Sequence, residues 1–141
     1  MNARIVVIED NQTNLDLMTF LLRAFGHETF EARSGEEGLA LIARETPDLV
    51  LCDLDLPGID GYQVVHRLRA ERGIDRTPAI AVTAYAMVGD RERALRAGFD
   101  GYIPKPIYPE TFVQQVEGFI TAGRRPSSAQ TSTRTMTRQG D

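Results

Sequence analysis

Residues 49–61 read Leu-Val-Leu-Cys-Asp-Leu-Asp-Leu-Pro-Gly-Ile-Asp-Gly, an apolar run that ends at Asp53 and leads into turn residues. A short apolar run bounded by Pro and Gly is typical of a parallel strand that is covered on both faces. Strand-like runs occur twice before this stretch and twice after it. We therefore predict strands at residues 4–8, 28–32, 48–53, 79–83 and 101–104.

Segments with apolar residues at helical spacing separate the predicted strands. The first begins after Asn11, a favourable capping residue, and its inward-facing apolar positions continue to Phe25, just before Gly26 ends the helix. Ser34 and Glu37 have the spacing of a capping box, which opens the second helix. The third helix is predicted at 61–72, the fourth ends at Gly98, and the fifth begins with Pro109.

Five strand–helix units predict an α/β fold, in which a five-stranded parallel sheet carries helices on both faces in a doubly wound (βα)5 arrangement. Right-handed crossovers place the carboxyl ends of all parallel strands at one edge of the sheet. Ligands of such sheets bind at that edge, where the strand order reverses. Residues far apart in sequence should meet there, namely Glu9, Asp10, Asp53, Thr83 and Lys105.

Lys105 is the only lysine among the 16 basic residues, and the others are arginines. An ammonium is a compact point charge, so one retained lysine indicates a local need for that shape. Clustered carboxylates repel one another by roughly 3–4 kcal/mol per close pair, so such a cluster indicates a bound cation, and its oxygen ligands suit Mg²⁺. Asp53 is the best-placed nucleophile, because carboxylates form acyl phosphates. The site is predicted to bind a phosphoryl group, with Mg²⁺ as cofactor.

The 141-residue chain is long enough for one domain with a substantial core, which we predict at residues 1–123. From Arg124 onward Arg, Ser, Thr and Gln dominate, so 124–141 is predicted to be a disordered tail. The net charge is −4 and the tail carries +3, which leaves −7 on the body. An acidic body argues against direct nucleic-acid binding. The sequence shows neither a leader nor a membrane-length apolar stretch, which favours a cytoplasmic protein without membrane insertion.

Cysteine and histidine give no metal-binding pattern in this sequence. The single cysteine, Cys52, excludes an internal disulfide, and its place in an apolar run predicts a small buried hydrophobic side chain. His27 follows the glycine that ends the first helix, and His66 lies within the predicted third helix. Neither histidine has a partner at metal-ligand spacing, and we expect both side chains at the surface.

Four segments together resemble the receiver domain of two-component response regulators, which has the CheY-like, or flavodoxin-like, fold. Each segment is a weak signal alone, but four in order at this spacing are specific. The resemblance covers roughly residues 4–122 and is strongest to DivK-type single-domain receivers. The segments are Glu-Asp-Asn at 9–11, Asp-Leu-Asp-Leu-Pro-Gly-Ile-Asp-Gly at 53–61, Ala-Val-Thr-Ala at 81–84 and Tyr-Ile-Pro-Lys-Pro at 102–106.

The resemblance implies a phosphoprotein of a phosphorelay, in which Asp53 accepts a phosphoryl group from phosphohistidine. The donor would be a histidine kinase or a histidine phosphotransfer protein. The resemblance also implies a Mg²⁺ ion held by the side chains of Asp10 and Asp53 and by the backbone carbonyl of Asp55. Glu9 would bind the ion directly or through water, and Lys105 would contact the phosphoryl group.

The same resemblance implies how the signal leaves the site. Thr83 contacts the phosphoryl group and forms a switch pair with Tyr102, whose ring turns inward when the hydroxyl moves. The aspartyl phosphate then changes the binding of a downstream protein target. Pro106 matches a cis proline of the family. The implied protein is a phosphoacceptor switch that catalyses its own phosphorylation and dephosphorylation, rather than an enzyme acting on other substrates.

Two alternatives to this reading of the sequence remain open. The order Asp53, Asp55, Thr83 and Lys105 also occurs in phosphatases of the haloacid-dehalogenase kind, although their acidic pair follows the lysine and a cap segment encloses the substrate. A phosphorylation-independent adaptor would keep the fold and lose the chemistry. Repeated turnover of a phosphomonoester would favour the first alternative, and partner binding that is insensitive to Asp53→Asn would favour the second.

Overall fold

The computed structural model describes residues 2–84 and 88–123, so the predicted tail at 124–141 lies outside the described residues. Within them, five parallel strands form one sheet in the order β2-β1-β3-β4-β5. The α/β prediction, with a five-stranded parallel sheet, is confirmed. In chain order the elements are β1 (Arg4–Ile8), α1 (Gln12–Ala24), β2 (Glu28–Ala32), α2 (Gly35–Glu45), β3 (Leu49–Cys52), α3 (Gly61–Ala70), β4 (Ala79–Thr83), α4 (Asp90–Ala97), β5 (Gly101–Pro104) and α5 (Pro109–Ala122).

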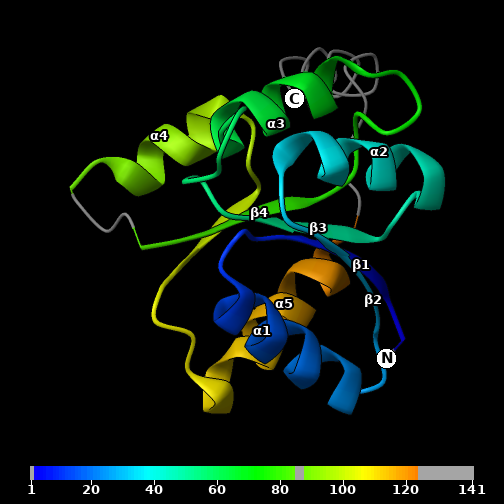
Figure 1. Cartoon of the computed structure of the whole chain (residues 1–141), viewed down its shortest axis with the longest axis vertical. Coiled ribbons are helices and arrows are strands. Elements are labelled where there is room, and N and C mark those ends of the chain that lie inside the picture. Colours follow the sequence, from blue (N-terminus) through cyan, green and yellow to red (C-terminus); the bar gives the residue numbers. More distant parts are fainter. Residues whose placement is uncertain (1, 85–87, 124–141) are drawn as a thin grey trace, which may run out of the picture.

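The helices cover both faces of the sheet, as the doubly wound prediction requires. Helices α1 and α5 lie on one face, and α2, α3 and α4 lie on the other (Figure 1). Alternate residues of each central strand enter one of two apolar clusters: Val6 and Val50 pack under α2 and α3, whereas Ile5 and Leu51 pack under α1 and α5. Because the central strands are buried on both faces, they appear in the sequence as continuous apolar runs.

The strand order determines where the carboxyl ends of the strands come together. The chain passes from β1 outward to β2, then returns across β1 to β3. The order therefore reverses between β1 and β3, and a parallel sheet of this kind leaves a crevice at that point. Glu9 directly follows β1 and Asp53 directly follows β3, so both carboxylates lie beside the crevice.

Local hydrogen bonds explain where the helices begin. The Asn11 side chain accepts from the Asn14 backbone N–H at 2.9 Å, and Ser34 accepts from the Glu37 N–H at 3.2 Å. Helix α3 begins with a reciprocal capping box that sequence reasoning missed, in which Asp60 and Gln63 each accept from the other's backbone N–H. These caps satisfy amide groups that the first turn of a helix leaves without partners.

Four sequence predictions about element ends and exposure were wrong. The apolar stripe of α1 stops at Leu22, because Phe25 lies at the C-terminal cap with 59% of its surface exposed. Strand β3 ends at Cys52 and not at Asp53, and α3 ends at Ala70 and not at residue 72. His27 is buried rather than exposed. His66 is exposed as predicted.

The buried His27 side chain connects three elements through hydrogen bonds. Its Nδ1 accepts from the Ala3 backbone N–H at 3.1 Å, and its Nε2 lies 2.8 Å from a Glu117 carboxylate oxygen on α5. Because Nδ1 is an acceptor here, Nε2 carries the proton and donates to Glu117. The imidazole thereby connects the start of β1 and the start of β2 to α5.

We expect His27→Ala to lower the free energy of unfolding by about 2–4 kcal/mol, since it removes one buried and one partly buried hydrogen bond and leaves the Ala3 N–H without its partner. Denaturant unfolding measures this change. His66→Ala is the matched control and should stay within about 0.5 kcal/mol of wild type, because the side chain is exposed. Equal stabilities of the two variants would show that the hydrogen bonds of His27 do not stabilise the fold.

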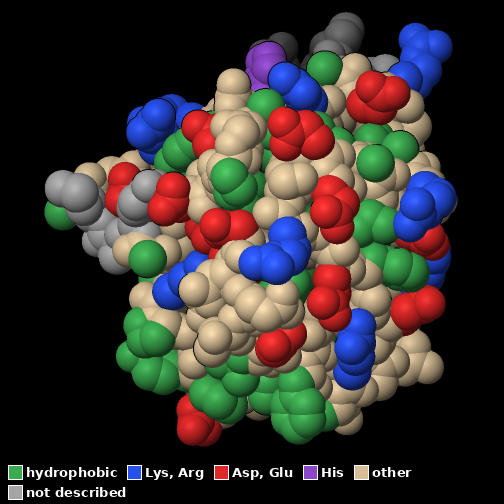
Figure 2. Space-filling view, viewed as in Figure 1, with side chains coloured by type: hydrophobic (Ala, Val, Ile, Leu, Met, Phe, Trp, Pro, Cys, Tyr) green, Lys and Arg blue, Asp and Glu red, His purple; other side chains and the backbone are tan. Residues whose placement is uncertain are grey.

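The surface of the described residues mixes charges of both signs. On the face seen in Figure 2, acidic and basic side chains are interspersed, and hydrophobic side chains gather along the lower margin, where α1 and α5 lie in Figure 1. Phe20 on α1 and Tyr108 before α5 are among the exposed large hydrophobic residues. None of the helices in the described part of the chain has the length and apolar character needed to span a membrane.

Candidate functional site

A pocket of about 290 Å³ lies at the carboxyl edge of the sheet, beside the reversal in strand order. It collects the residues that follow β1, β3, β4 and β5, as expected for a parallel sheet. All five residues predicted to meet there line it, and Asn11, Asn14, Asp55 and Ala84 complete the lining. The five are Glu9, Asp10, Asp53, Thr83 and Lys105.

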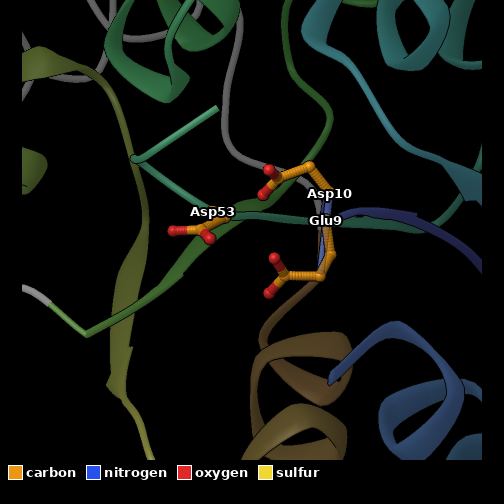
Figure 3. Close-up of side chains that lie close together, drawn as sticks. All are labelled: Glu9, Asp10 and Asp53. Atoms are coloured by element: carbon orange, nitrogen blue, oxygen red, sulfur yellow. The ribbon is translucent and has the colours of Figure 1, made fainter. Parts of the chain in front are cut away.

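Three carboxylates converge in this pocket. Glu9, Asp10 and Asp53 each offer one oxygen, and these oxygens lie within 4.8 Å of one another. Figure 3 shows the three side chains turned toward a common space, two from the end of β1 and one from the end of β3. Glu9 is 1% exposed and Asp53 is 5% exposed, so little water screens their repulsion.

Lys105 supplies the positive charge that the two buried carboxylates need. Its Nζ lies 2.5 Å from Glu9 Oε1 and 3.0 Å from Asp53 Oδ2. Burial alone would lower the pKa of Lys105, but its hydrogen bonds to Glu9 and Asp53 outweigh burial and raise that pKa. Lys105 is therefore charged at neutral pH. It follows β5, and its peptide bond to Pro106 is cis, as the family resemblance implied.

Burial raises the pKa of Glu9, because a carboxylate loses hydration in the interior, and the negative charge of Asp53 adds to the rise. The hydrogen bond from Lys105 opposes this rise. A cation bound next to Glu9 would oppose the rise in its pKa in the same way as Lys105 does. The electrostatics of the pocket thus favour cations.

Backbone hydrogen bonds fix the site residues to the sheet. The Asp53 N–H donates to the carbonyl of Ile8 at 3.0 Å, and the Lys105 N–H donates to the carbonyl of Thr83 at 2.9 Å. The Asp53 carboxylate also accepts from the Asp55 N–H at 3.1 Å. The side chains of Asp53 and Lys105 therefore extend from segments held by the parallel ladder, which limits their movement relative to each other.

The three carboxylates fit a small divalent cation. Their oxygens are hard ligands, and the exposure of Asp10 leaves one side of the cluster open to water, as Mg²⁺ prefers. Lys105 neutralises only part of the charge of Glu9, Asp10 and Asp53. The donor set, the surplus negative charge and the open side agree with the prediction of a Mg²⁺ site.

Thr83 and Tyr102 lie on adjacent strands, but only Thr83 lines the pocket. Thr83 is fully buried at the end of β4. Tyr102 is partly buried and packs against the cluster under α3 and α4. Its hydroxyl is buried and has no hydrogen-bond partner within residues 2–84 and 88–123, and burial raises its pKa. A hydroxyl in this condition would gain hydrogen bonds if the ring turned toward water.

Gly61 sets how closely α3 approaches the loop that carries Asp53. Its N–H donates to the carbonyl of Leu54 at 3.1 Å. A Cβ at this position would lie 2.7 Å from the Leu54 Cα and closer still to the carbonyl oxygen of Asp53. Both obstacles are backbone atoms next to the candidate acceptor, so a side chain there would displace the site itself.

We expect Gly61→Ala to lower the free energy of unfolding by about 2–3 kcal/mol, because the methyl group overpacks a backbone contact. Denaturant unfolding tests this expectation. Gly118→Ala is a suitable control, since no atom lies within 4 Å of the added methyl group in α5. That control should be stabilised by about 0.5–1 kcal/mol through helix propensity. A Gly61→Ala variant as stable as wild type would show that the contact is not tight.

Sequence reasoning missed two residues of this region. Asn14 lines the pocket from the first turn of α1, and Arg33 donates a hydrogen bond to the Asp10 carbonyl. Asn14 follows the capping residue Asn11 by three positions, a spacing that could have indicated proximity to the cluster. Arg33 lies 23 residues from Asp10, and no local sequence signal connects them.

Comparison with known proteins agrees with the fold. The model of the response regulator receiver domain family matches residues 5–117. The polar-differentiation response regulator DivK of Brucella ovis is 38% identical over 120 residues, which cover 85% of this chain and 98% of the relative. The chain therefore belongs to the response regulator receiver domain family.

Two solved structures show the same architecture. A CheY-like response regulator receiver domain protein from Methanospirillum hungatei JF-1 has a TM-score of 0.78 and 30% identity, covering 86% of this chain and 96% of the other. The receiver domain of sensor histidine kinase PA1611 from Pseudomonas aeruginosa PAO1 has a TM-score of 0.78 and 31% identity, covering 86% and 99%. The latter structure has a magnesium ion coordinated in its active site cleft.

Proposed function

We propose that Asp53 accepts a phosphoryl group from the phosphohistidine of a histidine kinase or a histidine phosphotransfer protein, with Mg²⁺ bound at the acidic cluster. The observation that carries this proposal is the convergence of Lys105 and three carboxylates at the end of β3. An ordinary surface cluster of acids would lack both the buried ammonium and the open pocket. Membership of the receiver family supports the same assignment.

The transfer requires Asp53 to act as a nucleophile. One carboxylate oxygen forms a bond to phosphorus while the bond from phosphorus to the donor imidazole nitrogen breaks, and the imidazole leaves with the electron pair. The Asp55 N–H, 3.1 Å from Asp53 Oδ1, restrains the carboxylate during the attack. The Lys105 ammonium lies 3.0 Å from Oδ2 and is placed to stabilise the negative charge on a phosphoryl oxygen during the transfer.

Mg²⁺ would be held by the side chains of Asp10 and Asp53, by the backbone carbonyl of Asp55, and by Glu9 directly or through water. When bound, it supplies positive charge to the phosphoryl oxygens and brings two anions together. Without that charge, the incoming phosphate would meet a net negative pocket. The presence of magnesium in the PA1611 receiver supports this assignment for a chain with the same fold.

The phosphoryl group switches the protein through Thr83 and Tyr102. The Thr83 hydroxyl moves to form a hydrogen bond with a phosphoryl oxygen. This movement changes the space available to the ring of Tyr102 on the neighbouring strand β5. The buried hydroxyl of Tyr102 has no partner among the described residues and would gain hydrogen bonds in an outward position, which supports a second position of the ring. To change the population from mostly inactive to mostly active, phosphorylation must stabilise the active state relative to the inactive one by about 5 kcal/mol.

The output is protein–protein binding in the cytoplasm, with a downstream protein as the target and no direct binding to nucleic acid. Phosphorylation and its reversal are self-catalysed, since the groups that stabilise the transferred phosphoryl also remain next to it in the product. The donor contributes phosphohistidine, and the receiver contributes the pocket.

The test offers acetyl phosphate to the wild-type chain with Mg²⁺ or with EDTA and measures the intact mass. We expect one addition of about 80 Da per chain, formed with Mg²⁺ and not with EDTA. No mass increase in either sample would contradict the proposal. Many turnovers of a generic phosphomonoester would instead support the phosphatase alternative.

A further inference from the structure

Arg33 donates a hydrogen bond to the main chain of Asp10, beside the acidic cluster. It is an exposed residue directly after β2, and its Nη2 donates to the backbone carbonyl of Asp10 at 2.8 Å. An arginine next to an aspartate commonly forms a bidentate pair with the carboxylate. Here the guanidinium binds the main chain of Asp10 and leaves the carboxylate available.

The bond from Arg33 completes a set of restraints on the turn after β1. The Glu9 N–H donates to the carbonyl of Ala32 at 2.9 Å, and the Asn11 N–H donates to the Glu9 carboxylate at 3.1 Å. These bonds fix the main chain before and after Asp10. Arg33 fixes the carbonyl of Asp10 itself, so it controls the orientation of the peptide from which the carboxylate extends.

Asp10 differs from the other two carboxylates of the cluster. Glu9 and Asp53 are paired with Lys105, whereas the Asp10 carboxylate has no side-chain partner within the part of the chain that the structure describes. The rotamers open to an unpaired, partly exposed carboxylate depend on the backbone conformation of its residue. A cation ligand at this position therefore depends on the orientation of the Asp10 main chain.

We infer that Arg33 is a positioning residue for the divalent cation, acting through the Asp10 carbonyl. The inference rests on the proposed function, because it assigns a role toward the same ion. Residues that hydrogen-bond a metal ligand from outside change metal affinity by about 10–100-fold when replaced. Arg33 holds a backbone atom and is exposed, so the lower end of this range applies.

The positive charge of Arg33 weakens Mg²⁺ binding, whereas its positioning role strengthens it. The direction in which the Kd changes when Arg33 is removed therefore shows which effect is larger. A positive charge near the cluster repels Mg²⁺, so its removal alone would tighten binding. Arg33 is exposed, so water weakens this repulsion, and at 1 M salt, where the Debye length is about 3 Å, the repulsion is largely screened. Positioning therefore outweighs repulsion, and the net effect of removing Arg33 is weaker binding.

The experiment titrates the full chain with Mg²⁺ alone by calorimetry at high salt, where repulsion is screened. We expect Arg33→Ala to raise the Kd for Mg²⁺ about tenfold. Arg33→Lys should recover part of the affinity, because its ammonium can donate one bond to the same carbonyl. Arg44→Ala is the charge-matched control: Arg44 is exposed and contacts Glu45, so its Kd should match wild type.

A second readout separates positioning from a general role in folding. With acetyl phosphate as donor, the Mg²⁺ concentration for half-maximal labelling should rise about tenfold in Arg33→Ala, while the rate at saturating Mg²⁺ stays within about twofold of wild type. An unchanged or lower Kd for Arg33→Ala would overturn the inference. So would a lower melting temperature without Mg²⁺ that leaves the Kd unchanged.

The outcomes also separate this inference from the proposed function. If wild type binds Mg²⁺ and takes the label but Arg33→Ala keeps full affinity, only the role of Arg33 fails. If wild type neither binds Mg²⁺ nor takes the label, both fail. Should Arg33→Ala not fold, Arg33→Lys tests the same point, because loss of the planar guanidinium at constant charge predicts an intermediate Kd.

Discussion

No phosphoryl group is expected on the Asp53→Asn variant after incubation with acetyl phosphate and Mg²⁺. The amide has nearly the shape of the carboxylate, but its nitrogen and oxygen are poor nucleophiles and cannot form an acyl phosphate. The side chain is 5% exposed and lies 3.0 Å from the Lys105 ammonium, so the replacement changes chemistry more than shape. Intact mass spectrometry measures the result.

Asp16→Asn is a matched control for this experiment. Asp16 is an exposed aspartate on α1 that accepts from the Gln12 side chain and does not line the pocket. It loses the same charge, and we expect it to take the label to the wild-type extent. A label on Asp53→Asn equal to that on Asp16→Asn would place the acceptor elsewhere in the chain.

Lys105→Met should slow labelling by acetyl phosphate by about 10²–10³-fold, the effect of removing one preorganised charge from a transition state. The methionine fills similar space but carries no charge to stabilise the phosphoryl oxygens. Lys105→Arg keeps the charge, yet its broad planar group does not fit a position 2.5 Å from Glu9 and 3.0 Å from Asp53. We expect an intermediate rate for that variant. Labelling of Lys105→Met at the wild-type rate would contradict the proposed role.

We also expect Lys105→Met to change how the melting temperature depends on pH. Burial raises the pKa of Glu9, and the hydrogen bond from Lys105 opposes that rise. A group whose folded pKa exceeds its unfolded value contributes stability at low pH that is lost as the pH rises through the folded pKa. Lys105→Met removes the opposing bond, so its melting temperature should fall further below that of wild type as the pH rises from acidic toward neutral. A constant difference across this range would contradict the coupling.

The sequence was sufficient to predict the sheet and five of the residues that line the pocket. Strands β1 and β3 are covered on both faces, so burial makes β3 apolar throughout and β1 apolar from Ile5 to Ile8. Glu9 and Asp53 immediately follow such strands, and the topology of a parallel sheet then determines that they meet. The prediction succeeded where one physical constraint decided the residue types.

Other features could not be predicted because their partners are distant in sequence. His27 is buried by an interaction with Glu117, 90 residues away, and its position after Gly26 gave no sign of this. Arg33 resembles any exposed arginine until the fold places it beside the Asp10 carbonyl. Phe25 continued a helical pattern, but the helix ended one residue earlier and left its ring exposed. Each of these depends on how elements pack, which periodicity does not encode.

The most direct test of the account locates the phosphoryl group on the wild-type chain. Treatment with acetyl phosphate and Mg²⁺, followed by borohydride, reduces an aspartyl phosphate to homoserine, and peptide mass spectrometry then identifies the position. We predict homoserine at position 53 and at no other aspartate, and none when EDTA replaces Mg²⁺. Homoserine at a different position, or a chain that carries the label without any change at position 53, would contradict the central claim.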